Sequence, residues 1–444
     1  AAGSEAPQEP AAYVCGFPDL EGRPPVQQIK DALTKLIQED VPIHVMSLPT
    51  ADVLEYFERG GDSESASLLK ARNLPFVQVN KCQDVMKLHL VPLAPSTGYT
   101  RFFDLQPHNG HMLLCTPPCT GITPTGITRN QFTVPPILHT LAADMAQQSA
   151  AVGIRCAGDL NASIQAGEVL QVVQLSEALH MKKLMEVVDA IAQRGAGLRA
   201  ACIGGPPCAG TLTFAAQLKS QLMAAGIPST LLCTDVYCPA DTPEAADAFD
   251  LQQFGKHVRH LLSGKEVAPP GSPLAPPRLT LPDRGLLLVH GALGLHPSVL
   301  GAVGATQCFR VCVAPVTRIC LDELTLLPPD ALLAMRRVLR DFNGAGVDAA
   351  TSLGRCSAAA GQGSLAPFLD GADAFVNSAA DYEIMALRME TESLLRCVRP
   401  GHAEFAHAAR LLDFVGHFYG LSRRSVPGGA LVQEFLGNSL FEAH

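Results

Sequence analysis

The sequence contains no tryptophan, and aromatic side chains make up only 5% of its 444 residues. Basic residues form no block, and the formal net charge is −9, which disfavours sequence-independent binding to nucleic acid. No apolar run reaches the ~18–20 residues of a membrane-spanning helix, so we expect no membrane span. Apolar residues nevertheless make up 47% of the chain. This composition suits layered α/β domains with cores of alanine, valine and leucine, and the length allows two or three such domains.

The 14 cysteines are scattered through apolar runs rather than grouped. Their surroundings, as at Cys202, predict buried reduced thiols. The nearest approaches to ligand pairs are Cys115 with Cys119 and Cys308 with Cys312. Neither has a second pair or histidines at zinc-site spacing, so we expect no metal site.

The chain begins AAGSEAPQEP, without methionine. Removal of an organelle-targeting segment would leave such a start, and so would trimming of the chain. Removal of a targeting segment predicts that the protein lies in an organelle, and we favour the mitochondrion.

The most informative stretch is Ala200–Leu222, in which a short apolar run enters a turn rich in glycine and proline and a helical pattern follows. A strand, a glycine loop and a helix in this order are typical of a phosphate-binding loop, in which backbone N–H groups hold phosphates. Gly205 and Gly210 have the required separation, but Thr211 and Leu212 follow where lysine and serine or threonine are needed. The stretch therefore predicts a nucleotide site that has lost its chemistry.

Composition shifts along the chain predict four parts. Residues 1–12 form a loose tail, 13–120 a compact α+β domain, 121–197 a linker and helical connector, and 198–444 an α/β domain. The last part alternates apolar runs with helical patterns, which predicts a parallel sheet with helices on both faces. Its predicted strands are Leu198–Ile203, Ser229–Thr234, Gly285–His290 and Cys308–Ala314.

Helical periodicity and strand-like runs give the other predicted elements. The predicted helices are Val26–Gln38, Thr50–Phe57, Ser63–Ala71, Pro136–Ala151, Asn161–Arg194, Thr213–Ala225, Asp250–Leu262, Ser298–Val303, Pro329–Phe342, Asp381–Arg396 and Ala403–Tyr419. The predicted strands of the first half are Val41–Leu48, Phe76–Val79, Lys87–Val91 and Arg101–Leu105.

From about residue 30 to its end, the chain resembles the long branch of the phosphoribulokinase/uridine kinase family. In that branch, a domain similar to the second additional domain of threonyl-tRNA synthetase precedes the kinase. The resemblance rests on these stretches, in chain order: VPIHVMSLP, VPLAPSTGYTRFFDL, GDLNASIQAGE, LSEALHMKKLMEVVDAIAQR, IGGPPCAGTLTFAAQL, TDVY, RRVLRDF, ADAFVNSAADYEIMAL and LVQEFLGNS. It implies a fold of P-loop type and an ATP- and Mg²⁺-dependent nucleoside kinase as the ancestral activity.

The chain departs from the family pattern where the chemistry lies. A loop of the type GPSSSGKTTF is GPPCAGTLTF here, the acidic DDYF type becomes Asp235–Cys238, and an EGIH stretch becomes His290–Leu293. In the N-terminal domain, His89 and Leu93 stand where the synthetase relatives carry a metal-binding cysteine and histidine. Because phosphoryl transfer depends on positioning and charge neutralisation, these joint losses predict a pseudoenzyme.

The candidate nucleotide-binding residues are Gly205, Gly210, Thr211, Thr213, Asp235 and Arg340, and no catalytic residue is expected. If activity survives, Asp235, Arg336 and Arg337 would support it. Each has a plainer interpretation: the glycine loop as a structural turn, Asp235 as a solvated strand end, and the arginines as a solvated or partner-facing stripe. His180 and Tyr237 are interpreted as packed residues.

The hypothesis favoured by these residues is an accessory or scaffolding subunit of a larger, mitochondrial assembly, with other protein subunits as partners. Two alternatives remain open, namely an active nucleoside or small-metabolite kinase and a nucleotide sensor without turnover. No cofactor is expected, and ATP and Mg²⁺ enter only if nucleotide binding survives.

Overall fold

The computed structural model describes residues 12–15, 25–90, 92–108, 111–115, 151–239, 246–270, 278–304, 307–317, 319–322, 325, 330–359, 366–369 and 371–441. The chain divides into two compact units, Ala1–Thr133 and Val134–His444. The predicted tail up to residue 11 and the predicted linker and connector up to residue 150, which includes most of the predicted helix 136–151, lie outside the described residues.

The first unit combines helices with two antiparallel sheets, ordered β2-β3-β4 and β1-β6-β5. Its elements are β1 (Ala12–Cys15), α1 (Val26–Gln38), β2 (His44–Pro49), α2 (Thr50–Gly60), α3 (Ser63–Arg72), β3 (Phe76–Cys82), β4 (Val85–Leu88), β5 (Asp104–His108) and β6 (His111–Cys115). Asp62 caps α3 by accepting a hydrogen bond from the Ser65 N–H at 3.0 Å, which fixes the start of that helix. The fold class predicted for this part, α+β, is therefore confirmed.

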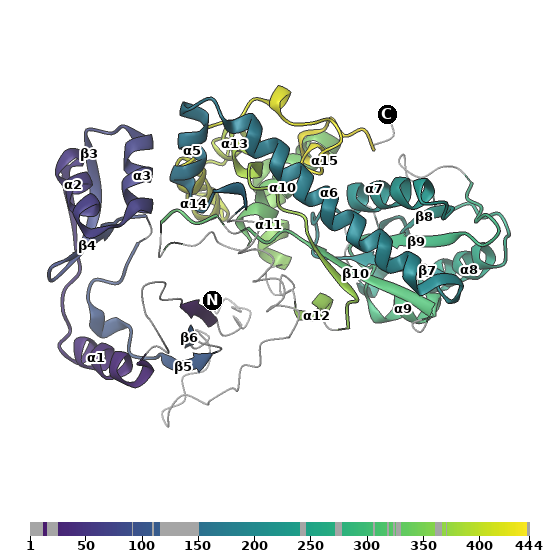
Figure 1. Cartoon of the computed structure of the whole chain (residues 1–444), viewed down its shortest axis with the longest axis horizontal. Coiled ribbons are helices and arrows are strands. Elements are labelled where there is room, and N and C mark those ends of the chain that lie inside the picture. The colour runs from purple at the N-terminus through teal and green to yellow at the C-terminus, as the bar shows by residue number, and fades with distance from the viewer. Residues whose placement is uncertain are drawn as a thin grey trace. The chain divides into compact units, whose positions relative to one another are not determined.

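The second unit is built on a parallel sheet of five strands in the order β11-β10-β7-β9-β8. Its strands are β7 (Ala200–Gly204), β8 (Ser229–Cys233), β9 (Leu286–His290), β10 (Cys308–Ala314) and β11 (Ala374–Asn377). Its helices of seven or more residues are α5 (Ala157–Gln165), α6 (Val169–Arg194), α7 (Thr211–Ala224), α8 (Leu251–Leu262), α9 (Pro297–Val303), α10 (Ala331–Ala345), α11 (Ala349–Ala359), α13 (Glu383–Leu395) and α14 (Phe405–Val415), and the short ones are α12 (Ala366–Leu369) and α15 (Gln433–Leu436). Figure 1 shows α7, α8 and α9 around these strands.

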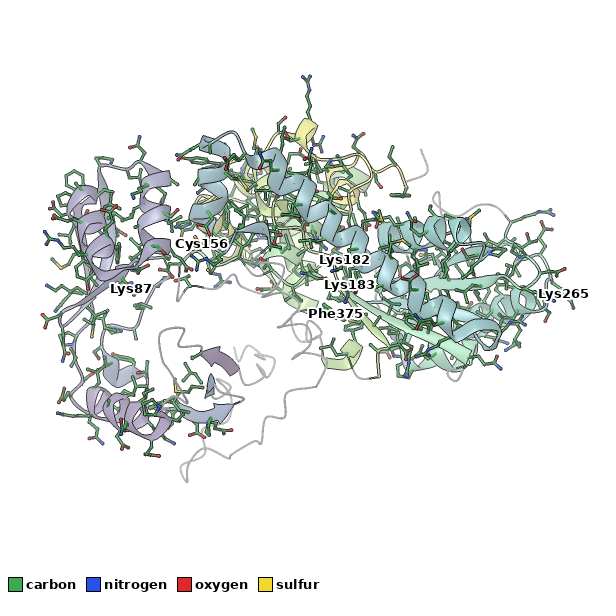
Figure 2. All side chains as sticks on the ribbon, viewed as in Figure 1. Lys87, Cys156, Lys182, Lys183, Lys265 and Phe375 are labelled. Atoms are coloured by element: carbon green, nitrogen blue, oxygen red, sulfur yellow. The ribbon has the colours of Figure 1, made fainter. Side chains whose placement is uncertain are left out.

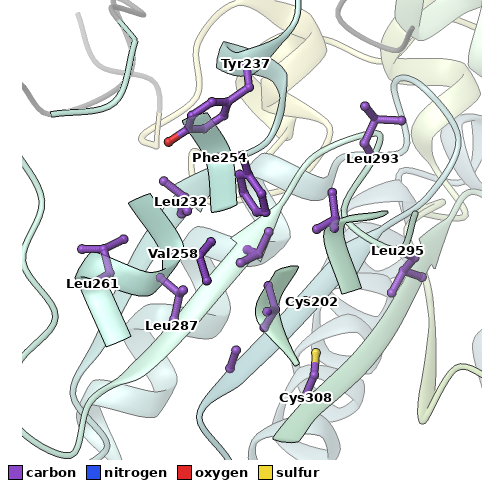
Figure 3. Packing of buried hydrophobic residues seen from close by; sticks show 14 of the residues in the cluster. Cys202, Leu232, Tyr237, Phe254, Val258, Leu261, Leu287, Leu293, Leu295 and Cys308 are labelled. Carbon is purple, nitrogen blue, oxygen red and sulfur yellow. The ribbon is translucent and has the colours of Figure 1, made fainter. Parts of the chain in front are cut away.

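The strands are buried because helices cover both faces of the sheet, as the alternating pattern predicts. Alternate positions such as Cys202 and Val289 pack with Phe254 and Val258 of α8 and with Val299 of α9 in one cluster. Figure 3 shows the α8 side chains over these strands. The ring of Tyr237 lies 5.3 Å from that of Phe254 in the same cluster, so its interpretation as a packed residue is confirmed.

The other face is covered by α7, whose Phe214, Leu218 and Leu222 are fully buried. The long helix α6 packs against α7, and it carries Lys182 and Lys183, the latter 3.1 Å from Glu186 (Figure 2). With the loop after β7 at the middle of the sheet, the unit has the α/β fold with a parallel sheet and helices on both faces that the sequence predicts.

The four predicted strands are present, as are the predicted helices that correspond to α7, α8 and α9, and their bounds differ from the prediction by a few residues. The prediction of a single helix Asn161–Arg194 is wrong. The chain breaks it into α5 and α6 at Gly167, which has φ +75°. A left-handed residue cannot continue a right-handed helix, and glycine takes this conformation at no steric cost. Sequence reasoning also missed β1, β6, β11 and α11.

Candidate functional site

The loop 205–210 lies between the central strand β7 and α7, at the carboxyl end of the sheet. The two neighbours of β7, which are β9 and β10, both come later in the chain and lie on opposite sides of it. In open α/β sheets this switch in strand order marks the place where ligands bind. The loop that sequence reasoning singled out therefore occupies the position of a binding site.

Close packing accounts for the two key glycines of the loop. A side chain at Gly205 would place its Cβ 1.8 Å from the backbone oxygen of Val313 on β10. Gly210 has φ +87°, and a Cβ there would lie 2.5 Å from Leu431. Both positions exclude larger residues whether or not a phosphate binds, because the backbone of β10 and the end of the chain approach so closely.

The loop is held from the core side by Arg336 of α10, whose side chain is fully buried. Its guanidinium forms an ion pair with Glu383, with Nε donating to Oε1 at 2.6 Å and Nη2 to Oε2 at 2.8 Å. Nη1 donates to the carbonyl oxygens of Cys208 and Ala209, each at 3.1 Å, and to Ser378. The donors of Arg336 are thus directed at protein groups, and they shape the loop from within the core.

This burial corrects the prediction of a solvated or partner-facing arginine stripe. Arg336 is 0% exposed and Arg337 is 5% exposed, because α10 packs both into the core. Arg340, one turn after Arg336, is the more exposed residue and lies 3.6 Å from Asp341. A phosphate clamp by Arg336 would require the buried ion pair with Glu383 to break.

At the start of α7, the expected place of a phosphate, lies the carboxylate of Glu434. Its Oε2 accepts a hydrogen bond from the Thr213 N–H at 3.1 Å and another from the Thr213 hydroxyl at 2.7 Å. Glu434 belongs to the short helix α15 near the end of the chain, 221 residues away in sequence. The chain therefore supplies its own anion to the helix N-terminus, where negative charge is favoured.

The segment that carries this carboxylate, Gly429–Leu436, is here called the C-terminal cover. The Gln217 side chain of α7 donates to the Gly429 carbonyl at 2.9 Å, and Asn343 of α10 donates to the Phe435 carbonyl at 2.9 Å. The guanidinium of Arg336 lies 4.6 Å from the centre of the Phe435 ring, a cation–π contact. These contacts tie the cover to the loop, to α7 and to α10 at once.

The interpretation of His180 as a packed residue is also confirmed. It is half-buried on α6, and its Nε2 lies 2.9 Å from Oε1 of Gln217, the residue that holds Gly429. Thr211, the first residue of α7, is half-buried as well.

Asp235 is not a bare solvated carboxylate. Its Oδ1 accepts hydrogen bonds from the Ala292 N–H at 3.1 Å and from the Thr234 hydroxyl at 3.0 Å. A Cβ at Gly291 would lie 2.3 Å from the same oxygen. Asp235 therefore joins the end of β8 to the turn after β9, a structural task that the strand-end interpretation overlooked.

His290, the last residue of β9, is buried opposite Ile203 of β7 and Cys233 of β8. Its Nδ1 has no hydrogen-bond partner among the residues that the structure describes. Burial lowers the pKa of His290 from 6.5 to about 4, because the charged ring would lose its hydration without gaining a partner. His290 is thus held neutral at the position where the sequence resemblance implies an acid.

This burial predicts an acid-sensitive second unit. The unfolded chain protonates His290 near pH 6.5 and the folded chain only near pH 4, so the unfolded state binds more protons between these values. Stability contributed by the neutral ring is therefore lost as the pH falls through this window, by about 2 kcal/mol between pH 7 and pH 5. Urea unfolding at both pH values should show this loss in the wild type and a correspondingly smaller one in His290→Leu. Equal pH dependence in the two proteins would contradict the account.

Among the described residues, no group of three or more His, Cys, Asp or Glu side chains is arranged to hold a metal ion. In the first unit, Nδ1 of His89 lies 2.7 Å from Oδ1 of Asn80, and Leu93 is exposed. Of the helices in the described part of the chain, none combines the length and the apolarity needed to cross a bilayer.

Sequence reasoning missed the two glutamates on which the site depends, Glu383 and Glu434. Both are buried, and Glu434 stands in the largely apolar stretch ALVQEFLG. Because acidic residues are rarely buried without a partner, an isolated acid in an apolar run is the signal that could have identified Glu434, whereas Glu383 follows Asp381 closely and carries no such signal. Their partners, 47 and 221 residues away, could not be read from that signal.

Comparison with known proteins leaves the family unassigned. No family model matches the chain, and no curated protein matches it. Among solved structures, it is similar to one from Silicibacter sp. TM1040 described as a "putative fructose transport system kinase", at 14% identity and a TM-score of 0.31. The match covers 43% of this chain and 98% of the other. A likeness this low says nothing about activity.

Proposed function

We propose that this chain is a uridine-kinase-like pseudoenzyme that serves as an accessory or scaffolding subunit of a larger protein assembly, with the mitochondrion as its compartment. The observation that carries the proposal is the carboxylate of Glu434 on the α7 N-terminus, in a loop without the phosphate-binding lysine. A negative charge at the phosphate position repels a triphosphate, and no lysine stands at the position of Thr211 to offset it.

Three further features support this proposal. Leu212 offers no hydroxyl for Mg²⁺, Arg336 pairs with Glu383 in the core, and Oδ1 of Asp235 accepts a hydrogen bond from the Ala292 N–H. Loss of one charge-stabilising group typically lowers the rate of such chemistry by ~10²–10³. Several losses at one site are not additive, but together they remove efficient turnover.

Purified full-length chain tests the enzymatic half of this proposal. With Mg·ATP and uridine or cytidine, we expect no phosphorylated nucleoside above the no-protein control, whereas an active uridine kinase assayed alongside supplies the positive reference. Turnover in the usual kinase range of about 1–100 s⁻¹ would overturn the proposal.

Native fractionation tests the structural half. A tagged full-length chain should elute from a mild extract of isolated mitochondria in a particle several times its own 46.9 kDa mass, together with a constant set of proteins. Elution as a lone chain, or absence from mitochondria, would contradict the corresponding part of the proposal.

A further inference from the structure

Glu434 is a buried carboxylate whose position calls for an explanation. Its side chain is 8% exposed, and its hydrogen bonds in the described structure all come from Thr213, through the N–H and the hydroxyl. Ionised carboxylates are seldom buried to this degree unless a cation or several donors compensate them. No lysine or arginine in the described residues forms an ion pair with Glu434, so the compensation comes from elsewhere.

The compensation comes from the start of α7. This helix has 14 residues, and Thr213 is its third, so the carboxylate lies among the first-turn N–H groups that have no partner within the helix. The aligned peptide dipoles add a partial positive charge at this end. Carboxylate and phosphate oxygens satisfy such groups in the same way, and the loop places the site at the carboxyl edge of the sheet.

Other residues of the C-terminal cover also pack against the start of α7 and the loop before it. Leu431 lies against Gly210, which is the residue before α7, and Phe435 lies over the guanidinium of Arg336. Both apolar side chains are buried, at 4% and 0% exposure. An incoming oxyanion could reach the Thr213 N–H only if Glu434, and with it this part of the cover, moved away.

We infer that the start of α7 is an oxyanion-binding site whose resident occupant is the Glu434 carboxylate, so that phosphate-bearing ligands bind only by displacing the C-terminal cover. This inference deepens the proposed function, because it concerns the same loop, but it makes a separate claim about binding. The ligand class is a small molecule with a terminal phosphate or pyrophosphate group. Because the occupant is part of the chain, the apparent affinity for the ligand is reduced by the fraction of molecules in which the cover is closed.

The test compares pyrophosphate binding to three full-length proteins by calorimetry: the wild type, Glu434→Ala, and Glu392→Ala as a matched control. Glu392 is also a carboxylate, but it lies on α13, and the ion pairs it forms are with Arg388 and Arg396. We expect Glu434→Ala to bind pyrophosphate at least about tenfold more tightly than the wild type, which corresponds to about 1.4 kcal/mol. The control should bind as the wild type does.

A folded Glu434→Ala protein with wild-type affinity would overturn the inference. Should that variant fail to fold, Glu434→Gln decides instead, since it keeps the shape and removes the charge, and it must show the same gain. In the wild type, saturating pyrophosphate should also speed amide exchange in Gly429–Leu436, and unchanged exchange there would count against displacement.

The same variants separate this inference from the proposed function. Pyrophosphate binding to Glu434→Ala without nucleoside phosphorylation supports both. If Glu434→Ala phosphorylated the nucleoside at the rate of the active uridine kinase used as reference, the result would support displacement of the cover. It would also overturn the proposal that the chain is a pseudoenzyme. Absence of binding would overturn the inference and leave the pseudoenzyme unaffected.

Discussion

Replacing Arg336 by methionine is expected to lower the free energy of unfolding of the second unit by about 3–5 kcal/mol, because it leaves the buried carboxylate of Glu383 without its cation. The carbonyl oxygens of Cys208 and Ala209 lose their donor in the same substitution. Urea unfolding followed by circular dichroism measures the change. The effect should exceed that of any surface charge in the molecule.

The matched control is Arg388→Met. Arg388 also pairs with a glutamate, Glu392, but both side chains are partly exposed, and such pairs contribute about 0–1 kcal/mol. The double variant Arg336→Met/Glu383→Leu should recover part of the lost stability, since removing both charges abolishes the unpaired carboxylate. An Arg336→Met protein as stable as the control would show that the guanidinium does not hold the loop.

Replacing Gly205 by alanine is the second large expected effect. The new Cβ would meet the Val313 backbone oxygen at 1.8 Å, and a strand backbone in the middle of a sheet cannot yield as a flexible side chain can. We expect a loss of about 3 kcal/mol or more, at the upper end of overpacking effects, seen as a lower urea midpoint.

Gly301→Ala provides the opposite control. Gly301 lies within α9, and a Cβ there meets no atom within 4 Å. Alanine at that position should stabilise the helix by about 0.5–1 kcal/mol. If both alanine variants changed stability alike, the close approach of β10 to the loop would not explain the glycine.

The sequence predicts most of the second unit because its signals are local. The apolar runs of β7, β8, β9 and β10 and the spacing of Phe214, Leu218 and Leu222 depend on residues a few positions apart. β11 was missed because its four residues are too few for a clear pattern. The break between α5 and α6 was missed because the apolar period continues on both sides of Gly167.

The candidate site was predictable only in part. The missing lysine is visible in the sequence, and so is the loop itself. What fills the site is not visible, because Glu434 reaches Thr213 from the far end of the chain. The same holds for Arg336, whose neighbours suggested a solvated arginine stripe although Glu383 and Ser378 enclose it. Partners distant in sequence decide whether a charge is exposed or structural.

Calorimetric titration of the full-length wild-type chain with Mg·ATP tests the central claim most directly. The account predicts no saturable heat at micromolar nucleotide, because the Glu434 carboxylate already occupies the α7 N-terminus and no lysine meets the terminal phosphate. Saturable binding with a dissociation constant in the micromolar range, about −8 kcal/mol, would contradict it.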